Sequence, residues 1–160
     1  MQITETFKNK IKSNEGSKEY QIHLGYFRNK RYHLYRCSQG FRTIGFGHNA
    51  ESEIQKDPKA YINGVTEQEA EQLLEMDIQK AVTQANYYFN IKDHNLAIQE
   101  LVVELIFQLG IGTALKFKRF KAHLDAKRYK EAADELIASN WYKQTPSRVQ
   151  KHVDVLRSQQ

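Results

Sequence analysis

One glutamate and the single cysteine of the chain are the residues whose surroundings first suggest chemistry. Glu15 stands in the triplet "NEG", directly after residues 3–13, whose apolar side chains recur at every fourth position and predict a short amphipathic helix. Cys37 stands in "YRCSQGFRTIGFGH", residues 35–48, which has the pattern of a strand, a glycine turn and a second strand. A carboxylic acid that follows a helix and faces a small glycine-rich sheet suits the general acid of glycoside cleavage.

Glycoside cleavage also needs negative charge on the far side of the sugar, and the sequence limits which side chain supplies it. Between the helix and the end of this sheet the only other acid is Glu19, one helical turn from Glu15 and too close to face it. A second anionic group from the sheet would therefore be the thiolate of Cys37, favoured if Arg36 and Arg42 lie near. The alternative for Cys37 is a small buried hydrophobic residue, the commoner role of a lone cysteine.

A long helix is predicted over about residues 66–88 and carries an unexpected charge. It opens with a capping box, in which Thr66 is followed by Glu69. Asp77 falls in the centre of its apolar stripe, and a buried carboxylate is costly unless it is paired, so we expect it to pair with His48. The stripe consists of Ala70, Leu73, Leu74, Ile78, Ala81, Ala85 and Tyr88.

The remaining elements predict an α+β fold with a β-rich first lobe and a larger helical lobe. Residues 20–36 partly alternate apolar and polar side chains around "RNK", which indicates a β-hairpin. "LAIQELVVELIFQLG" is apolar almost all round and predicts a buried central helix that ends at Gly110. Shorter helices are expected at about 115–124, 128–138 and 146–157, the last with Thr145 as N-cap and Pro146 at its first position.

Length and composition limit the function classes. The chain has 160 residues, which fits one domain, and no run of 18 apolar residues, so no membrane span is expected. Its first residues lack the apolar core of a signal peptide. A single cysteine excludes an internal disulfide and a zinc site built on several thiolates. The net charge of +5 is concentrated toward both ends, which suits an anionic polymer but equally fits ordinary solvated faces.

Several sequence blocks together resemble the phage lysozyme family of the T-even type. The blocks occur in the order of the family and span nearly the whole chain; they are "NEG" at 14–16, "TIGFGH" at 43–48, "TEQEAEQLLEMDI" at 66–78, "FQLG" at 107–110, "RYKEAA" at 128–133 and "WYKQTPSR" at 141–148. The resemblance implies a single lysozyme-like domain over 1–160. Its parts would be a β-rich lobe at about 14–65, a connecting helix at about 66–88 and a helical lobe at about 95–158.

The resemblance also implies catalytic roles. The family pattern is a glutamate, then an aspartate or cysteine, then five residues and a threonine, which Glu15, Cys37 and Thr43 match here. Cys37 thus resembles a tolerated variant, as nucleophile or as base, and Thr43 would hold a water or intermediate. The spacing departs from the family, because 21 residues separate Glu15 from Cys37. An inserted hairpin at about 20–36 whose ends meet would restore the geometry.

Further residues match supporting positions of the family. The resemblance assigns His48 and Asp77 to a structural ion pair. The substrate-binding positions that it implies are Phe107, Gln108, Trp141, Arg148, Asn49, Phe120 and Glu135. Arg148 would also be able to pair with Glu15. No metal and no cofactor is implied.

The function that the resemblance implies is a muramidase, which cleaves the β-1,4 bond between N-acetylmuramic acid and N-acetylglucosamine in bacterial peptidoglycan. A monomer is expected, held in the host cytoplasm until a holin releases it, or else carried on a virion tail. Two alternatives stay open. One is a lysozyme-like domain that binds wall without cutting it. The other is a single-stranded nucleic-acid-binding protein, suggested by the interleaved aromatic and basic residues of "GYFRNKRYHLYR" although no nucleic acid is expected.

Overall fold

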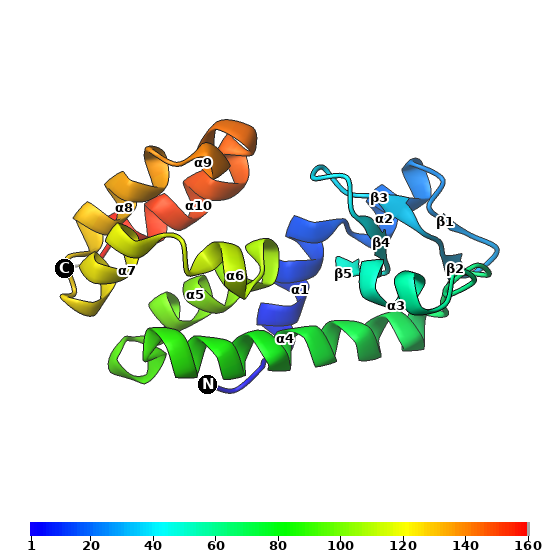
Figure 1. Ribbon diagram of the computed structural model, residues 1–160, viewed down its shortest axis with the longest axis horizontal. Helices are drawn as coiled ribbons and strands as arrows, with labels where there is room; N and C mark the ends of the chain where they lie inside the picture. Colours follow the sequence, from blue (N-terminus) through cyan, green and yellow to red (C-terminus); the bar gives the residue numbers. More distant parts are fainter. Residues whose placement is uncertain (160) are drawn as a thin grey trace. The chain divides into compact units, whose positions relative to one another are not determined.

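The computed structural model describes residues 1–159 and consists of two compact units (Figure 1). Residues 2–79 form the N-terminal unit, and the chain from Lys80 onward, with Met1, forms the C-terminal unit. The long helix α4 (Glu67–Phe89) contains the boundary between them. The expected α+β architecture is confirmed, since the strands lie in the N-terminal unit and the C-terminal unit is helical in its described part.

Helix α1 (Glu5–Glu15) ends at the candidate acid. It begins at Thr4, whose side chain accepts a hydrogen bond from the backbone N–H of Phe7 (3.1 Å). It stops at Gly16, which has a φ of +116°, a conformation that side chains with a Cβ rarely adopt. The helix is therefore displaced by two residues from the predicted 3–13, and Glu15 is its last residue, as the sequence indicates.

The segment after α1 differs from the single hairpin predicted over 20–36. Its first part is helix α2 (Lys18–His23), which Ser17 caps by accepting a hydrogen bond from the N–H of Tyr20 (3.3 Å). Only residues 27–32 form the hairpin, with strands β1 (Phe27–Arg28) and β2 (Arg31–Tyr32). The two turn residues between them have φ values of +52° and +62°, as a tight hairpin turn requires. A serine cap, which acts locally, thus overrides the weak alternation at the start of the segment.

A second, three-stranded antiparallel sheet lies in the same unit, in the order β3–β4–β5. Its strands are β3 (Tyr35–Arg36), β4 (Arg42–Ile44) and β5 (His48–Asn49), followed by helix α3 (Glu51–Lys56). Tyr32 of the hairpin is fully buried and exchanges backbone hydrogen bonds with Val65 (2.8 Å each), which holds the hairpin to the residues just before α4.

Lysine–glutamate pairs join α1 and the start of α2 to the first turns of α4. Lys8 contacts Glu75 (3.2 Å), Lys18 contacts Glu67 (3.0 Å), and Lys12 pairs with Glu71. The predicted capping box of α4 is present, because Thr66 and Glu69 each accept a hydrogen bond from the backbone N–H of the other (3.1 and 3.2 Å). Most of the predicted apolar stripe is buried, but Leu73 is only half-buried and Tyr88 is 40% exposed. Val82 and Phe89, which were not predicted, are buried as well.

The C-terminal unit surrounds the apolar helix α5 (Leu96–Leu109), as predicted. Thr145 is the N-cap residue of α10 (Pro146–Arg157) and Pro146 is its first residue, as predicted, but the hydroxyl of Thr145 donates to the carbonyl of Trp141 (3.1 Å) and makes no capping bond to the helix. None of the helices in the described residues is long and apolar enough to cross a bilayer. The other elements are η1 (Ile91–Asp93), α6 (Ile111–Ala114), α7 (Lys118–Asp125), α8 (Tyr129–Ile137), α9 (Asn140–Gln144) and α10 (Pro146–Arg157).

Candidate active site

The side chain of Glu15 lies against a glycine of the small sheet. A Cβ placed on Gly47 would stand 3.1 Å from Cβ, Cγ and Oε2 of Glu15, so the absence of a side chain at Gly47 makes room for the carboxylate. Gly47 also has a φ of +86°, which favours glycine independently. The Oε1 atom of Glu15 is shielded from solvent, while the residue as a whole is half-buried. The end of α1 therefore places the side chain of Glu15 directly against the turn between β4 and β5.

Tyr35 connects the catalytic candidates. Its hydroxyl donates to the backbone carbonyl of Glu15 at 3.5 Å, and its Cα pairs with that of Thr43 across the sheet. Cys37 follows two residues later, and its N–H donates to the carbonyl of Phe41 (2.9 Å), which continues the ladder beyond β3. Because side chains alternate along a strand, Tyr35, Cys37 and Thr43 belong to the same face of the sheet. After the long segment that contains α2, β1 and β2, the chain therefore returns to the end of α1.

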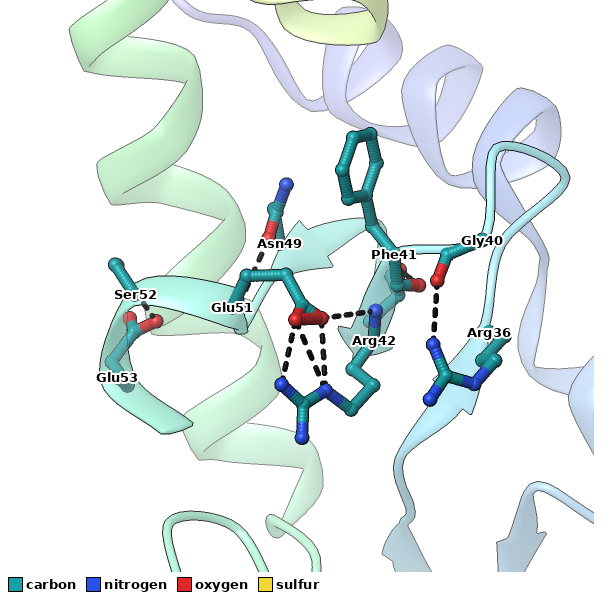
Figure 2. A network of polar contacts seen from close by, with 9 residues as sticks. Arg36, Gly40, Phe41, Arg42, Asn49, Glu51, Ser52 and Glu53 are labelled. Atoms are coloured by element: carbon teal, nitrogen blue, oxygen red, sulfur yellow. Dashed lines mark hydrogen bonds and ion pairs between the residues drawn. The ribbon is translucent and has the colours of Figure 1, made fainter. Parts of the chain in front are cut away.

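The opposite face of the same strands carries an arginine–glutamate pair (Figure 2). Arg42 donates from Nε and Nη2 to Glu51 at 2.7–3.1 Å, and its backbone N–H donates to the same carboxylate (2.9 Å). These bonds from Arg42 lower the pKa of Glu51 to about 2. Arg36, whose Cα pairs with that of Arg42, donates from Nη1 to the carbonyl of Gly40 (2.8 Å). Arg36 and Arg42, which would favour a thiolate if they lay near it, thus donate to the carbonyl of Gly40 and to the carboxylate of Glu51.

Thr43 and Cys37 differ in exposure. Thr43 is 4% exposed, and its hydroxyl donates to the carbonyl of Phe41 (2.9 Å). Cys37 is half-buried and forms no disulfide. Its carbonyl accepts a hydrogen bond from the N–H of Gly40 (2.8 Å), which closes the turn after β3. The residue is thus only half-buried, which differs from the fully buried cysteine of the alternative interpretation.

His48 lies between two carboxylates. Its Nδ1 contacts Oδ2 of Asp77 at 2.8 Å, which confirms the predicted contact, and its Nε2 contacts Oε1 of Glu53 at 2.7 Å. Burial alone would lower the pKa of His48, but the hydrogen bonds and charges of the two carboxylates outweigh it and raise that pKa. Glu53 was missed from sequence, because it lies on the short helix α3 and nothing in its spacing marks it.

The remaining predicted sugar contacts are divided between the units. Asn49 is exposed on β5, where its Oδ1 accepts from the N–H of Glu51 (2.9 Å). Phe120 is only 1% exposed, so its side chain belongs to the core of the C-terminal unit, which counts against the predicted contact with a sugar. Glu135 forms an ion pair with Arg119 (3.1 Å).

A cluster around the indole of Trp141 contains another predicted residue. Trp141 is 5% exposed and packs on Phe117 and His152, with ring centroids 6.4 and 5.5 Å apart. Gln108 approaches the same histidine, with Oε1 3.4 Å from Nε2 of His152. The two other predicted contacts of the C-terminal unit, Phe107 and Arg148, are half-buried.

Comparison with known proteins defines the class. Residues 26–158 match the model of the family described as Phage lysozyme, so the chain belongs to the phage lysozyme family and is a glycoside hydrolase by class. It is also similar to two Dictyostelium discoideum proteins named "Probable T4-type lysozyme 1" and "Probable T4-type lysozyme 2". Each is 26% identical to this chain, and each alignment covers 84% of this chain and 91% of the relative. The family match includes Cys37 and Thr43 and begins after Glu15 and α2.

Proposed function

We propose that this chain is a peptidoglycan muramidase that cleaves the β-1,4 bond between N-acetylmuramic acid and N-acetylglucosamine. The observation that carries the proposal is the position of Tyr35, which contacts the end of α1 at Glu15 and pairs with Thr43. Family membership supports a lysozyme-type glycosidase. The return of the chain to Glu15 supports a working site despite the long excursion before Cys37.

In the proposed reaction, Glu15 donates its proton to the glycosidic oxygen as the bond from that oxygen to the anomeric carbon breaks. Cys37 provides the group on the other side of that carbon. As a nucleophile its sulfur would bond to the carbon, and water would later displace it. As a base it would take a proton from the attacking water. Thr43 would orient that water or the intermediate through its hydroxyl.

The proposed catalytic roles are tested by turbidity clearing of purified peptidoglycan and of bacteria with permeabilised outer membranes. Glu15→Gln should abolish clearing, because the amide cannot donate a proton, whereas the matched variant Glu19→Gln should retain it. Cys37→Asp should keep or raise activity, and Cys37→Ala should lose most of it. Full activity of Glu15→Gln would show that Glu15 is not the general acid. Full activity of Cys37→Ala would show that the thiol contributes only to packing.

Product analysis separates the two roles of Cys37 and the alternatives to an enzyme. Retention of the anomeric configuration in the first product, followed by NMR, would identify Cys37 as nucleophile, and inversion would identify it as base. Wall binding without clearing by the wild-type protein would favour the non-catalytic wall-binding domain. Salt-dependent retention of single-stranded DNA on filters, again without clearing, would favour nucleic-acid binding.

The biological setting that we propose is lysis of a bacterial host by a phage, either as an endolysin released through a holin or as an enzyme of the virion tail. The family description supports this setting, and the two relatives reported above come from an amoeba. Synthesis of the protein inside bacteria, with and without a co-expressed holin, tests it. Holin-dependent lysis would support an endolysin, whereas lysis of permeabilised cells only from outside would support a tail enzyme.

A further inference from the structure

The inserted helix α2 contributes a buried glutamine to the surroundings of the candidate acid. Gln21 is 1% exposed, although it lies in a short helix whose other side chains are exposed or half-buried. Its Nε2 donates to the carbonyl of Gly16 (3.0 Å) and to the carbonyl of Gly45 (2.9 Å). Gly16 directly follows the candidate acid in the chain, and Gly45 belongs to the turn between β4 and β5.

These two bonds close a ring of contacts around Glu15. The carboxamide of Gln21 joins the residue after Glu15 to Gly45, and the same turn continues to Gly47. Gly47 in turn lies against the side chain of Glu15, because a Cβ placed on Gly47 would stand 3.1 Å from it, closer than ordinary van der Waals contact. Both the backbone and the side chain of Glu15 are therefore tied to one turn of the sheet, and Gln21 supplies the hydrogen bonds that hold the two together.

The backbone of Gln21 supports the same end of α1 by a second route. Its carbonyl accepts a hydrogen bond from the N–H of Tyr26 (2.8 Å). The ring of Tyr26 stacks on that of Tyr35, with centroids 4.6 Å apart and planes inclined by 8°. The hydroxyl of Tyr35 donates to the carbonyl of Glu15. The segment between α1 and β4 thus supports the end of α1 twice, through Gln21 near its start and through Tyr35 near its end.

The two carbonyl partners of Gln21 fix the orientation of its amide group, and this orientation costs stability. Two carbonyl oxygens require the NH₂ group to face them, because a flipped amide would place oxygen against oxygen. In the part of the chain that the structure describes, the Oε1 of Gln21 is then buried without a hydrogen-bond partner. A buried acceptor without a partner is destabilising, so this orientation of the amide reduces stability.

We infer that Gln21 is a positioning residue for the reaction proposed above. It fixes the end of α1 against the β4–β5 turn, so that the carboxyl group of Glu15 points at the scissile bond. This inference rests on the proposed role of Glu15 as general acid. The inserted segment would then support catalysis through Gln21, whereas a purely structural spacer would not.

The test replaces the amide by an apolar group of the same length, in Gln21→Met, and measures hydrolysis of soluble peptidoglycan fragments. We expect kcat to fall about 10- to 100-fold, because a small misplacement of a catalytic group has effects of this size. KM should change less than about twofold, since binding of the sugar chain does not depend on the proton donor. The matched control is Thr4→Ala, which removes the cap at the other end of α1 and should leave kcat unchanged.

The outcomes separate this inference from the proposed function. An active wild type, an inactive Glu15→Gln and a Gln21→Met with unchanged kcat would overturn the positioning role alone. An equal loss of kcat in Thr4→Ala would also overturn it, because the effect would then be one of general stability. An inactive wild type would overturn the proposed function instead. If Gln21→Met is unfolded at the assay temperature, Gln21→Asn tests the same geometry, because its shorter amide cannot span both carbonyls; wild-type kcat there would count against the inference.

Discussion

The histidine between two carboxylates makes stability depend on pH in a defined direction. We consider the variant Asp77→Asn, which removes one charge beside the side chain of His48, itself only 9% exposed. Breaking a buried ion pair by removing one partner costs about 3–5 kcal/mol. Asp77 is 23% exposed and Glu53 remains as a partner, so we expect a cost below that range, about 2–3 kcal/mol at pH 5.5. In a chain of this size that loss corresponds to a fall in Tm of roughly 5–10 °C.

The pH window follows from the directions of the pKa shifts. The pKa of His48 is raised above its ordinary 6.5, so its stabilising contribution is complete below that pH and disappears as pH rises through the folded-state value. Burial alone would raise the pKa of Glu53, but the hydrogen bond and charge of His48, together with the hydrogen bonds from its own backbone and from Ser52, outweigh burial and lower that pKa below 4.5. The contribution of Glu53 is therefore present above pH 4.5 and lost as pH falls. Together the groups stabilise most between about pH 4.5 and 6.5.

Urea denaturation of wild type and variant at pH 5.5 and pH 9 measures the effect. The difference in unfolding free energy should shrink to about 1 kcal/mol at pH 9, where His48 is neutral and only a neutral hydrogen bond is lost. Glu53→Gln should cost less, about 0.5–1 kcal/mol, because Glu53 is 37% exposed. The control His23→Gln changes an exposed histidine of the same unit and should show no such pH dependence. An equal cost of Asp77→Asn at both pH values would refute the reasoning.

Two further predictions concern a glycine and a second histidine. Gly47→Ala should lower kcat about 100-fold, because the new Cβ would displace the side chain of Glu15. The control Gly25→Ala changes a glycine with a similar positive φ but with nothing within 4 Å of the new Cβ, so it should lower only stability. Equal kcat values in the two variants would contradict the steric argument. Burial lowers the pKa of His94, so its contribution to stability is present above pH 6.5 and falls as pH decreases. His94→Gln should therefore reduce the change of Tm with pH in thermal melts between pH 4.5 and 7.5. An unchanged dependence of Tm on pH would count against this prediction.

Part of the candidate site could be read from local patterns in the sequence. The end of α1 at Glu15 follows from the spacing of apolar residues and from the glycine after it, and both act within a few residues. The start of α4 follows from its capping box. The partner of Asp77 was also predictable, because a carboxylate in an apolar stripe requires one and few candidates exist.

Other features depend on contacts between segments far apart in the chain, for which the sequence holds no periodic signal. Gln21 looks like an ordinary polar residue of a helix, and its burial arises only because the β4–β5 turn folds over it. Glu53 and Glu51 on α3 have no spacing that reveals their bonds to His48 and Arg42. The contact of Tyr35 with the end of α1 at Glu15 required the intervening segment to fold back, because a stretch of this length allows many arrangements. Local spacing thus fixes where helices begin and end, whereas the packing of distant segments determines which side chains meet.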